Sequence, residues 1–484
     1  MDGVSDAAAG TLTRRRLLAV GTGTVGALVL AACGGPRSTP PKALPGTARY
    51  LSRPDLSPTL ITQRGPAGAP GAGYVCVTPS GPMLVDDFGD PVWVRPVPHA
   101  ATNLRVQRYG GRPVLTWWQG QVTHYGVGFD GEYVVLDESY RQLMTVKAQH
   151  GLSADLHEFV ISADGVAYFT AYRQFTTDLR AVGGPRRGTA LDATVQAVDL
   201  ASGALVFDWH SAEHIAMSES HAAYSTRAPY DPVHLNSIDI TPDGMLLLSA
   251  RNTWAVYKVD PRSGDVVWRL GGKRSDFELG SGVRFAWQHD ARGHADGTMT
   301  LFDDEGDPPE ASQSRGLVLA VDETAKKVTL VRQYVHPRRP LLAASQGSMQ
   351  VLANGDVLVG WGAEPYYTEY RSDGTVVVDA RFERGQSYRA FRFPWRGTPT
   401  ERPAVAARRG PDGVTVYASW NGSTETTNWE VLGGHHRHGL STVGAAEKTG
   451  FETPITTVGN PGYVAVVARD GTGRRLASSG VLAV

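Results

Sequence analysis

The chain has 484 residues, which is enough for two or three ordinary domains or for one large repeat architecture with an appendage. Its composition is that of a globular protein, and its 56 glycines and 30 prolines suit many short strands joined by tight turns. The formal net charge is −1 and no long basic run occurs, which argues against nucleic acid as a partner.

The first residues predict an export signal and a lipid anchor. Residues 13–18 (TRRRLL) resemble a twin-arginine export motif, and an apolar run over residues 19–32 follows, at about 14 residues too short for a spanning helix. The run ends in LAACG at 30–34, which resembles a bacterial lipobox. We therefore expect residues 1–33 to be a signal peptide and Cys33 to carry a lipid. The anchor would hold the protein on the outer face of the cytoplasmic membrane. An ordinary secretory peptide that happens to end in Cys is the alternative.

The next segment predicts a tether. Residues 34–70 are rich in Pro, Gly, Ser and Thr, which favours a flexible linker with a short ordered piece near residues 56–62. The only other cysteine, Cys76, lies in a strand-like stretch and has no partner once Cys33 is lipidated. We expect it to be a small buried side chain.

A strand–turn–strand pattern recurs from about residue 74. Its clearest copy, residues 234–271, reads as two hairpins around a Pro-Asp-Gly turn and a Ser-Gly turn. Four strands in about 40 residues is the size of one propeller blade. The outer hairpin recurs at 83–95, 133–146, 195–209, 256–270, 318–332 and 367–382. Inner hairpins precede most of these, at 102–118, 157–172, 234–252, 289–304 and 346–361.

The repeat predicts an all-β fold, a six-bladed β-propeller over residues 71–399. Residues 386–398 are a candidate for the strand that closes the ring, and a run of unrelated hairpins is the alternative. At about residue 400 the pattern changes to short strands with frequent Gly turns, which predicts an appended β-sandwich-like domain over 400–484. Trp420 and Trp429 are expected in its core. The HHRH stretch at 435–438 is expected in a surface loop.

Aligned on their turns, the inner hairpins place polar residues at one position. His157, Asn236 and His289 each lie seven residues before the turn Asp of their hairpin. Because strand side chains alternate with a period of two, we expect these residues at one depth of the central channel, with His234 two residues further along the same face.

One cross-strand pair is predicted as well. If residues 241–244 form a four-residue loop, Ile240 pairs with Met245 and His234 lies opposite Arg251. A turn that is one residue longer or shorter would change this register.

Three insertions interrupt the repeat, at 174–193, 211–233 and 271–288. The last two are expected at the channel mouth, where loops on a rigid scaffold commonly carry specificity; solvated connections without function are equally open. Tyr224 and Tyr230, in the second insertion, are candidate substrate-binding residues.

The polar ring suits an oxyanion better than a metal. Three imidazoles could bind zinc with an open position, but Arg251 facing His234 would repel a dication. Arg and Asn beside His complement a tetrahedral sulfate or phosphate group, and Arg292 adds a further cation. One His could then attack sulfur or phosphorus while another protonates the leaving oxygen. Asp290 is expected on the opposite face, where it would orient a neighbouring strand.

No Gly-rich phosphate cradle occurs, so a nucleotide donor is not expected. We expect no other cofactor and no metal.

Three stretches resemble the bacterial arylsulfotransferase family, in particular its exported and lipid-anchored branch. They are residues 234–271, FAWQHDAR at 285–292 and GSMQVLANGDVLVGWG at 347–362. The resemblance covers most of residues 70–400. It implies a six-bladed propeller that transfers a sulfuryl group from an aryl sulfate to a phenol without a nucleotide, by a ping-pong mechanism through a sulfated histidine.

Carried over to this sequence, the resemblance implies that His289 is the nucleophile, with His234 and Asn236 beside it. It places Arg251 on the sulfuryl oxygens and His157 as a second histidine contact and proton donor. The C-terminal module, the lipobox and the lack of a Cys pair depart from the best-studied members. They leave open a non-catalytic, envelope-anchored propeller that binds an anionic ligand or a cell-wall component. A metal-dependent hydrolase is the third hypothesis.

Overall fold

The computed structural model describes residues 44–64, 70–411 and 413–484, all within one compact unit. The predicted signal peptide and Cys33 lie outside these residues. No helix in the described part of the chain has the length and apolar character needed to cross a membrane.

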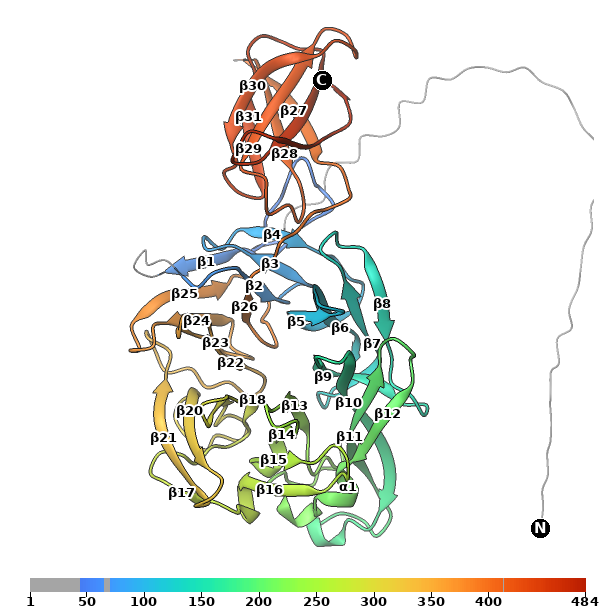
Figure 1. The fold of residues 1–484 in the computed structure, drawn as a ribbon, viewed down its shortest axis with the longest axis vertical. Coiled ribbons are helices and arrows are strands. Elements are labelled where there is room, and N and C mark those ends of the chain that lie inside the picture. The colour runs from blue at the N-terminus through green and yellow to red at the C-terminus, as the bar shows by residue number, and fades with distance from the viewer. Residues whose placement is uncertain (1–43, 65–69, 412) are drawn as a thin grey trace, which may run out of the picture. The chain divides into compact units, whose positions relative to one another are not determined.

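Six sheets of four or five strands, almost all antiparallel, follow one another along the described chain between residues 61 and 393 (Figure 1). The first three contain, in turn, β26 (Phe391–Phe393), β2 (Tyr74–Val77), β3 (Met83–Val85) and β4 (Pro91–Val94); β5 (Ala100–Tyr109), β6 (Arg112–Val122), β7 (Gly128–Leu136) and β8 (Gln142–Val146); and β9 (Ser153–Ile161), β10 (Val166–Thr177), β11 (Gly188–Asp199) and β12 (Leu205–His210).

The next three contain β13 (Leu235–Ile240), β14 (Leu246–Ala250), β15 (Ala255–Val259) and β16 (Val266–Gly271); β18 (His289–Gly293), β19 (Thr298–Asp303), β20 (Arg315–Asp322), β21 (Lys327–Tyr334) and β17 (Glu278–Leu279); and β22 (Ser348–Val351), β23 (Val357–Gly360), β24 (Tyr366–Tyr370), β25 (Val376–Phe382) and β1 (Ile61–Arg64). The helical pieces in the described chain are single turns: α1 (Ser211–His214), η1 (Arg180–Val182), η2 (Met217–Glu219), η3 (Arg251–Thr253) and η4 (Gly272–Arg274).

The innermost strands form a closed ring. Strands β26, β5, β9, β13, β18 and β22 contact one another in this order, and β22 contacts β26 again. They lie around the centre of the ring in Figure 1. The fold is a β-propeller, as the repeat predicts, and its described part supplies six such sheets as blades. Strand β26 pairs with β2, so the predicted closing segment at 386–398 is confirmed.

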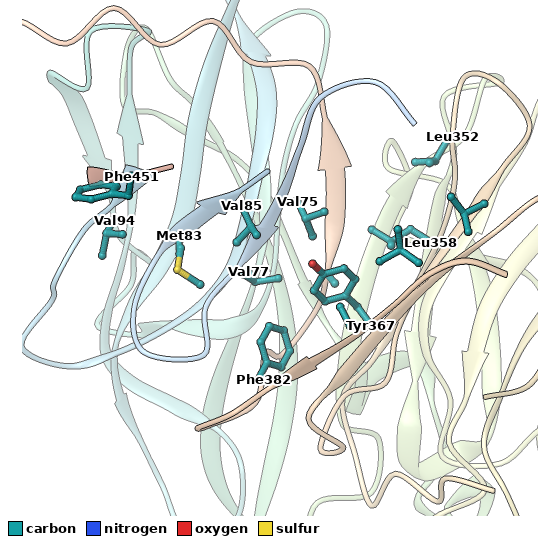
Figure 2. Packing of buried hydrophobic residues seen from close by; sticks show 14 of the residues in the cluster. Val75, Val77, Met83, Val85, Val94, Leu352, Leu358, Tyr367, Phe382 and Phe451 are labelled. Atoms are coloured by element: carbon teal, nitrogen blue, oxygen red, sulfur yellow. The ribbon is translucent and has the colours of Figure 1, made fainter. Parts of the chain in front are cut away.

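Apolar side chains seal the junction between the first and last blades. Figure 2 shows Val75 and Val77 of the first blade packed in one cluster with Tyr367 and Phe382 of the sixth. Each of these side chains is at most 1% exposed. Burying one such side chain stabilises a fold by about 1.5–3 kcal/mol, so this cluster holds together blades that lie far apart in the sequence.

Part of the predicted tether belongs to the propeller. Ile61–Arg64 is β1, which pairs with β25 as the outermost strand of the sixth blade. Leu56 is 1% exposed and packs in the same apolar cluster as Val75 and Phe382. The ordered piece predicted near residues 56–62 is present, and it continues to Arg64 as a propeller strand because β25 offers it an edge. Cys76 is buried and unpaired, as predicted, and burial raises the pKa of its thiol to about 12.

The C-terminal residues form two further sheets, as predicted for a sandwich-like module. One contains β27 (Ala404–Gly410), β28 (Gly413–Ser419) and β31 (Glu452–Thr456); the other contains β29 (Asn428–Gly434), β30 (Ser441–Glu447), β32 (Tyr463–Arg469), β33 (Arg475–Ser478) and β34 (Leu482–Ala483). Trp429 is fully buried in the core between them and Trp420 packs against it, as predicted. Residues 435–438 are exposed, which agrees with a surface loop.

Candidate active site

Three histidines from successive blades line one cavity of about 240 Å³. His157 lies in β9, His234 immediately precedes β13, and His289 begins β18. The rings of His157 and His234 are 4.7 Å apart and nearly perpendicular. Tyr388, just before β26, closes the floor, with its ring 5.7 Å from His157 and 6.3 Å from His289. The structure therefore brings together the three histidines that the sequence aligned.

A β-bulge brings His234 into this set. Ile240 pairs with Leu246, so the predicted pairing with Met245 is wrong by one residue. The register then shifts between Leu235 and Ser237. After this bulge the carbonyl of His234 accepts from the backbone N–H of Arg251 at 2.9 Å, so the two residues are opposite after all. His234 adopts a left-handed φ of 55°, a conformation that costs a non-glycine residue about 1–3 kcal/mol.

The same bulge takes Asn236 away from the cavity. Its side chain is fully buried, and Nδ2 donates to the Gln288 carbonyl at 2.7 Å. Asn236 therefore joins the fourth and fifth blades, and the structure does not place it among the groups that line the histidine cavity.

The neighbours of His289 fix its tautomer. Nδ1 lies 2.8 Å from Asp304 Oδ2 and 3.1 Å from the Trp287 carbonyl, and both can act as acceptors. Nε2 lies 3.2 Å from the backbone N–H of Gln346, which can only donate. Nδ1 therefore carries the proton and Nε2 keeps its lone pair.

Burial controls the charge of this pair. Burial lowers the pKa of His289 well below its ordinary value, and the charge of Arg251 adds to the effect. Burial also raises the pKa of Asp304 well above that of a free carboxyl, against the opposing charge of Arg251. A more basic carboxyl holds the Nδ1 proton more strongly, which keeps electron density on Nε2. The pair presents a neutral imidazole whose Nε2 lone pair accepts from the Gln346 N–H, a contact that a substrate has to displace before Nε2 can act as a nucleophile.

The other two histidines have the same arrangement. His157 Nδ1 hydrogen-bonds Asp155, whose carboxylate also accepts from the Gly128 N–H at 2.7 Å. Burial alone would raise the pKa of Asp155, but the His157 ring and the hydrogen bonds hold it below its ordinary value. His234 Nδ1 lies 2.6 Å from Asp231 Oδ2. Each imidazole thus has a carboxylate behind it, which orients its Nε2 side away from that partner.

A buried ionic cluster fills the channel next to the cavity. Glu158 pairs with three arginines, Arg105, Arg292 and Arg389, and Asp290 pairs with two of them. Glu158, Asp290 and Arg389 have fully buried side chains. Burial would raise the pKa of Glu158, but the three guanidinium groups hold it well below its ordinary range. Arg292 is therefore engaged by carboxylates, and the structure does not place it among the groups that line the cavity.

Asp290 does reach a neighbouring strand, as predicted. Its Oδ2 accepts from the Met349 N–H at 3.1 Å, which ties β18 to β22.

The sequence reasoning missed several residues of the site, among them Asp155 and Asp231 behind their histidines. Asp304, Glu158, Tyr388 and Arg389 carry weak signals: Glu158 follows His157, Asp304 is the middle of an acidic triplet that ends a buried strand, and the other two lie in the closing segment. None of these signals names a partner, because the partners come from other strands or other blades.

Among the described residues, no group of three His, Cys, Asp or Glu side chains has the spacing needed to hold a metal ion.

A family model described as "Arylsulfotransferase (ASST)" matches residues 105–383. The chain belongs to the arylsulfotransferase family. The matched span runs from the second blade to the sixth and contains all three histidines of the cavity. It supports sulfotransferase activity in general terms.

Other comparisons add no functional argument. No curated protein matches this arylsulfotransferase-family chain. A solved protein of unknown function from Bacteroides caccae is 13% identical over 66% of this chain and 98% of its own, with a TM-score of 0.41. Virginiamycin B lyase from Staphylococcus aureus is 8% identical over 75% of this chain and 96% of its own, with a TM-score of 0.34.

Two of the remaining predicted residues, Tyr230 and Arg251, line a second cavity of about 240 Å³ together with Asp231 and Trp287 among others. Arg251 Nη2 donates to the carbonyls of Ala344 at 3.0 Å and Asp307 at 3.4 Å, and its guanidinium stacks on Trp287. It is therefore in a wall behind the histidines instead of in their cavity.

Tyr224 packs against Tyr230 in an apolar cluster of the insertion at 211–233. Asp231 connects the two cavities, because it lines the second and hydrogen-bonds His234 of the first.

Proposed function

We propose that the chain is an aryl-sulfate sulfotransferase that uses no nucleotide donor. It moves a sulfuryl group from a phenolic sulfate ester to a phenolic acceptor, through a sulfated His289. The observation that carries the proposal is the set of three imidazoles on one cavity, each backed by its own carboxylate, with Nε2 of His289 held as a lone pair.

In the first half-reaction, His289 Nε2 attacks the sulfur of the donor. The N–S bond forms while the bond between sulfur and the aryl oxygen breaks, and the electron pair leaves with the phenolate. The imidazolium of His157 gives this oxygen its proton, which the Asp155 carboxylate favours by stabilising the charged ring. Asp304 takes up positive charge from the sulfated ring by holding its Nδ1 proton.

The second half-reaction reverses these steps with the acceptor. Neutral His157 removes the phenol proton, the phenol oxygen attacks sulfur, and the N–S bond breaks, returning the electron pair to Nε2 of His289. His234, 4.7 Å from His157, is the second imidazole placed to share that proton.

Fixed donors and charges favour the anionic sulfuryl group. The Gln346 N–H, which caps Nε2 at 3.2 Å, is positioned to turn to a sulfuryl oxygen once the N–S bond forms. Burial lowers the pKa of His289 most, and the positive charge of Arg251 lowers it further, so this charge lies close to the ring. The same positive charge would attract the negative sulfuryl group on that ring.

The decisive experiment is intact mass spectrometry after exposure to 4-nitrophenyl sulfate alone. We expect one equivalent of 4-nitrophenol and the mass of one added sulfuryl group, mapped to His289, and we expect this mass to be lost to the acceptor when a phenol is then added. His289→Asn should abolish both. His150→Asn is the matched control, because that ring is exposed and pairs with Asp208 away from the cavity. Turnover that survives in His289→Asn refutes the proposal.

A non-catalytic binder is the second candidate. One observation favours it. The Arg251 guanidinium group donates to the carbonyls of Ala344 and Asp307 and does not line the histidine cavity. Melting shifts with aryl sulfates, without turnover or a sulfated intermediate, would identify this function.

We also propose that the chain is exported and anchored through a lipid on Cys33, on the motifs at 13–18 and 30–34. Expression in a bacterium should place it in the membrane fraction, and Cys33→Ser should release it.

A further inference from the structure

A second group of charged residues lies on the outer strands of the sixth blade, around a cavity of about 360 Å³. Strand register brings them together: Arg64 of β1 pairs with Asp379 of β25, and Thr62 pairs with Arg381, which pairs in turn with Tyr366 of β24. Side chains two residues apart on a strand share a face, so these residues line one face of the blade. We call the space the outer-blade cavity.

The loop after β21 supplies the opposite wall. His336, whose side chain is 1% exposed, hydrogen-bonds the Arg339 carbonyl through Nδ1 at 3.2 Å. Its Nε2 lies 3.2 Å from Asp379 Oδ1, but without hydrogen-bond geometry, and this buried atom has no hydrogen-bond partner among the described residues. Asp379 is already engaged by Arg338 Nε at 2.6 Å. The contact with Asp379 is therefore close but irregular, and a ligand oxygen would give this buried nitrogen a regular hydrogen bond.

The cavity carries excess positive charge. Four arginines line it against two carboxylates, Asp379 and Glu383. The side chain of Arg64 makes no hydrogen bond or ion pair with any residue that the structure describes. The one carboxylate contact of the Arg381 side chain is from Nη1 to Glu383 at 3.2 Å. Arg339 stacks on Tyr366 with its guanidinium 5.6 Å from the ring. Several guanidinium N–H groups thus remain available.

We propose that the outer-blade cavity binds a phosphate group. Arginine forks match the geometry of phosphate oxygens bidentately, and four guanidinium groups from three chain segments converge here around a buried imidazole. A volume of about 360 Å³ lies within the range of small-ligand pockets, about 300–1,000 Å³, and leaves room for part of the molecule that carries the phosphate. The cavity shares no lining residue with the histidine cavity, so the site is independent of sulfuryl transfer.

Two binding experiments on the full chain test this site and distinguish the source of the phosphate. In the first, inorganic phosphate is titrated by calorimetry at an ionic strength held constant with chloride. In the second, the full chain carrying Cys33→Ser is sedimented with vesicles of phosphatidylglycerol or of phosphatidylcholine. Arg64→Gln and Arg381→Gln are compared with Arg262→Gln, a control whose side chain is 81% exposed and pairs with Asp260.

Saturable phosphate binding that weakens about tenfold in each cavity variant, and not in the control, supports a site for a free phosphorylated ligand. Sedimentation with phosphatidylglycerol that the cavity variants lose and the control keeps assigns the phosphate to a lipid headgroup. Equal behaviour of the wild type, the cavity variants and the control in both experiments overturns the proposal. None of these readouts depends on whether the chain transfers sulfuryl groups.

Discussion

Replacing Asp304 by asparagine tests whether the carboxyl behind His289 tunes the nucleophile. The change keeps the size of the side chain and replaces the carboxyl group, 2.8 Å from Nδ1, by an amide that cannot carry a charge. The Trp287 carbonyl, 3.1 Å from the same nitrogen, remains and still selects the Nδ1–H tautomer. Asp304 acts through His289, so it is a positioning residue.

The magnitude follows from these two contacts. A hydrogen bond to a charged group contributes about 1.5–3 kcal/mol, and each 1.36 kcal/mol changes a rate tenfold. We therefore expect sulfation of the enzyme to slow by about 10- to 150-fold. Loss of the tautomer itself would cost about 10⁴-fold, as in catalytic triads, but the Trp287 carbonyl prevents that.

The assay is the single-turnover release of 4-nitrophenol from 4-nitrophenyl sulfate, measured across pH. When His289 takes up a proton, Asp304 can balance the charge as a carboxylate and the amide cannot, so the acid limb of kcat/KM should move to lower pH in Asp304→Asn. The control is Asp303→Asn, which removes a buried carboxylate that pairs with Arg315 and not with His289. An unchanged rate and pH profile in Asp304→Asn, or the same loss in both variants, would show that the carboxyl has no special role.

Three further results are expected. Glu158→Gln should lower the free energy of unfolding by about 3–5 kcal/mol in urea titrations, because three buried arginines lose their shared carboxylate; a loss below 1 kcal/mol would contradict this. Burial lowers the pKa of His234 and His289 below the value of about 6.5 that a histidine has in the unfolded chain. Just below pH 6.5 these two rings therefore bind protons in the unfolded chain but not in the folded chain. Stability should therefore fall as the pH drops below about 6.5, less steeply in His289→Gln, and equal slopes would argue against the shift. The Cys76 thiol, with its pKa raised to about 12 by burial, should react with a disulfide reagent only after unfolding, and rapid reaction of the folded chain would disprove its burial.

The sequence by itself determined the propeller and its histidines. Hairpin patterns with turn residues at fixed spacing specify strands locally, and each blade repeats the same local rule. The alignment of the inner hairpins therefore placed His157 and His289 at one level with His234 on the same face, and the predicted hairpin register set Arg251 opposite His234. Residues 386–398 were only one candidate for the closing strand, and the pairing of β26 with β2 confirms that candidate.

Only the tertiary structure decided what surrounds each histidine. A bulge at Asn236 exchanged that residue for His234, and a bulge depends on how two strands twist together, which the pattern of one strand does not encode. The partners Asp304 and Arg389 come from other strands or blades, so no spacing along the chain announces them. Strand β1 formed because β25 left an edge free, which a Pro- and Gly-rich composition could not reveal. Local periodicity thus fixed the elements, while contacts between blades fixed the charges and protons of the site.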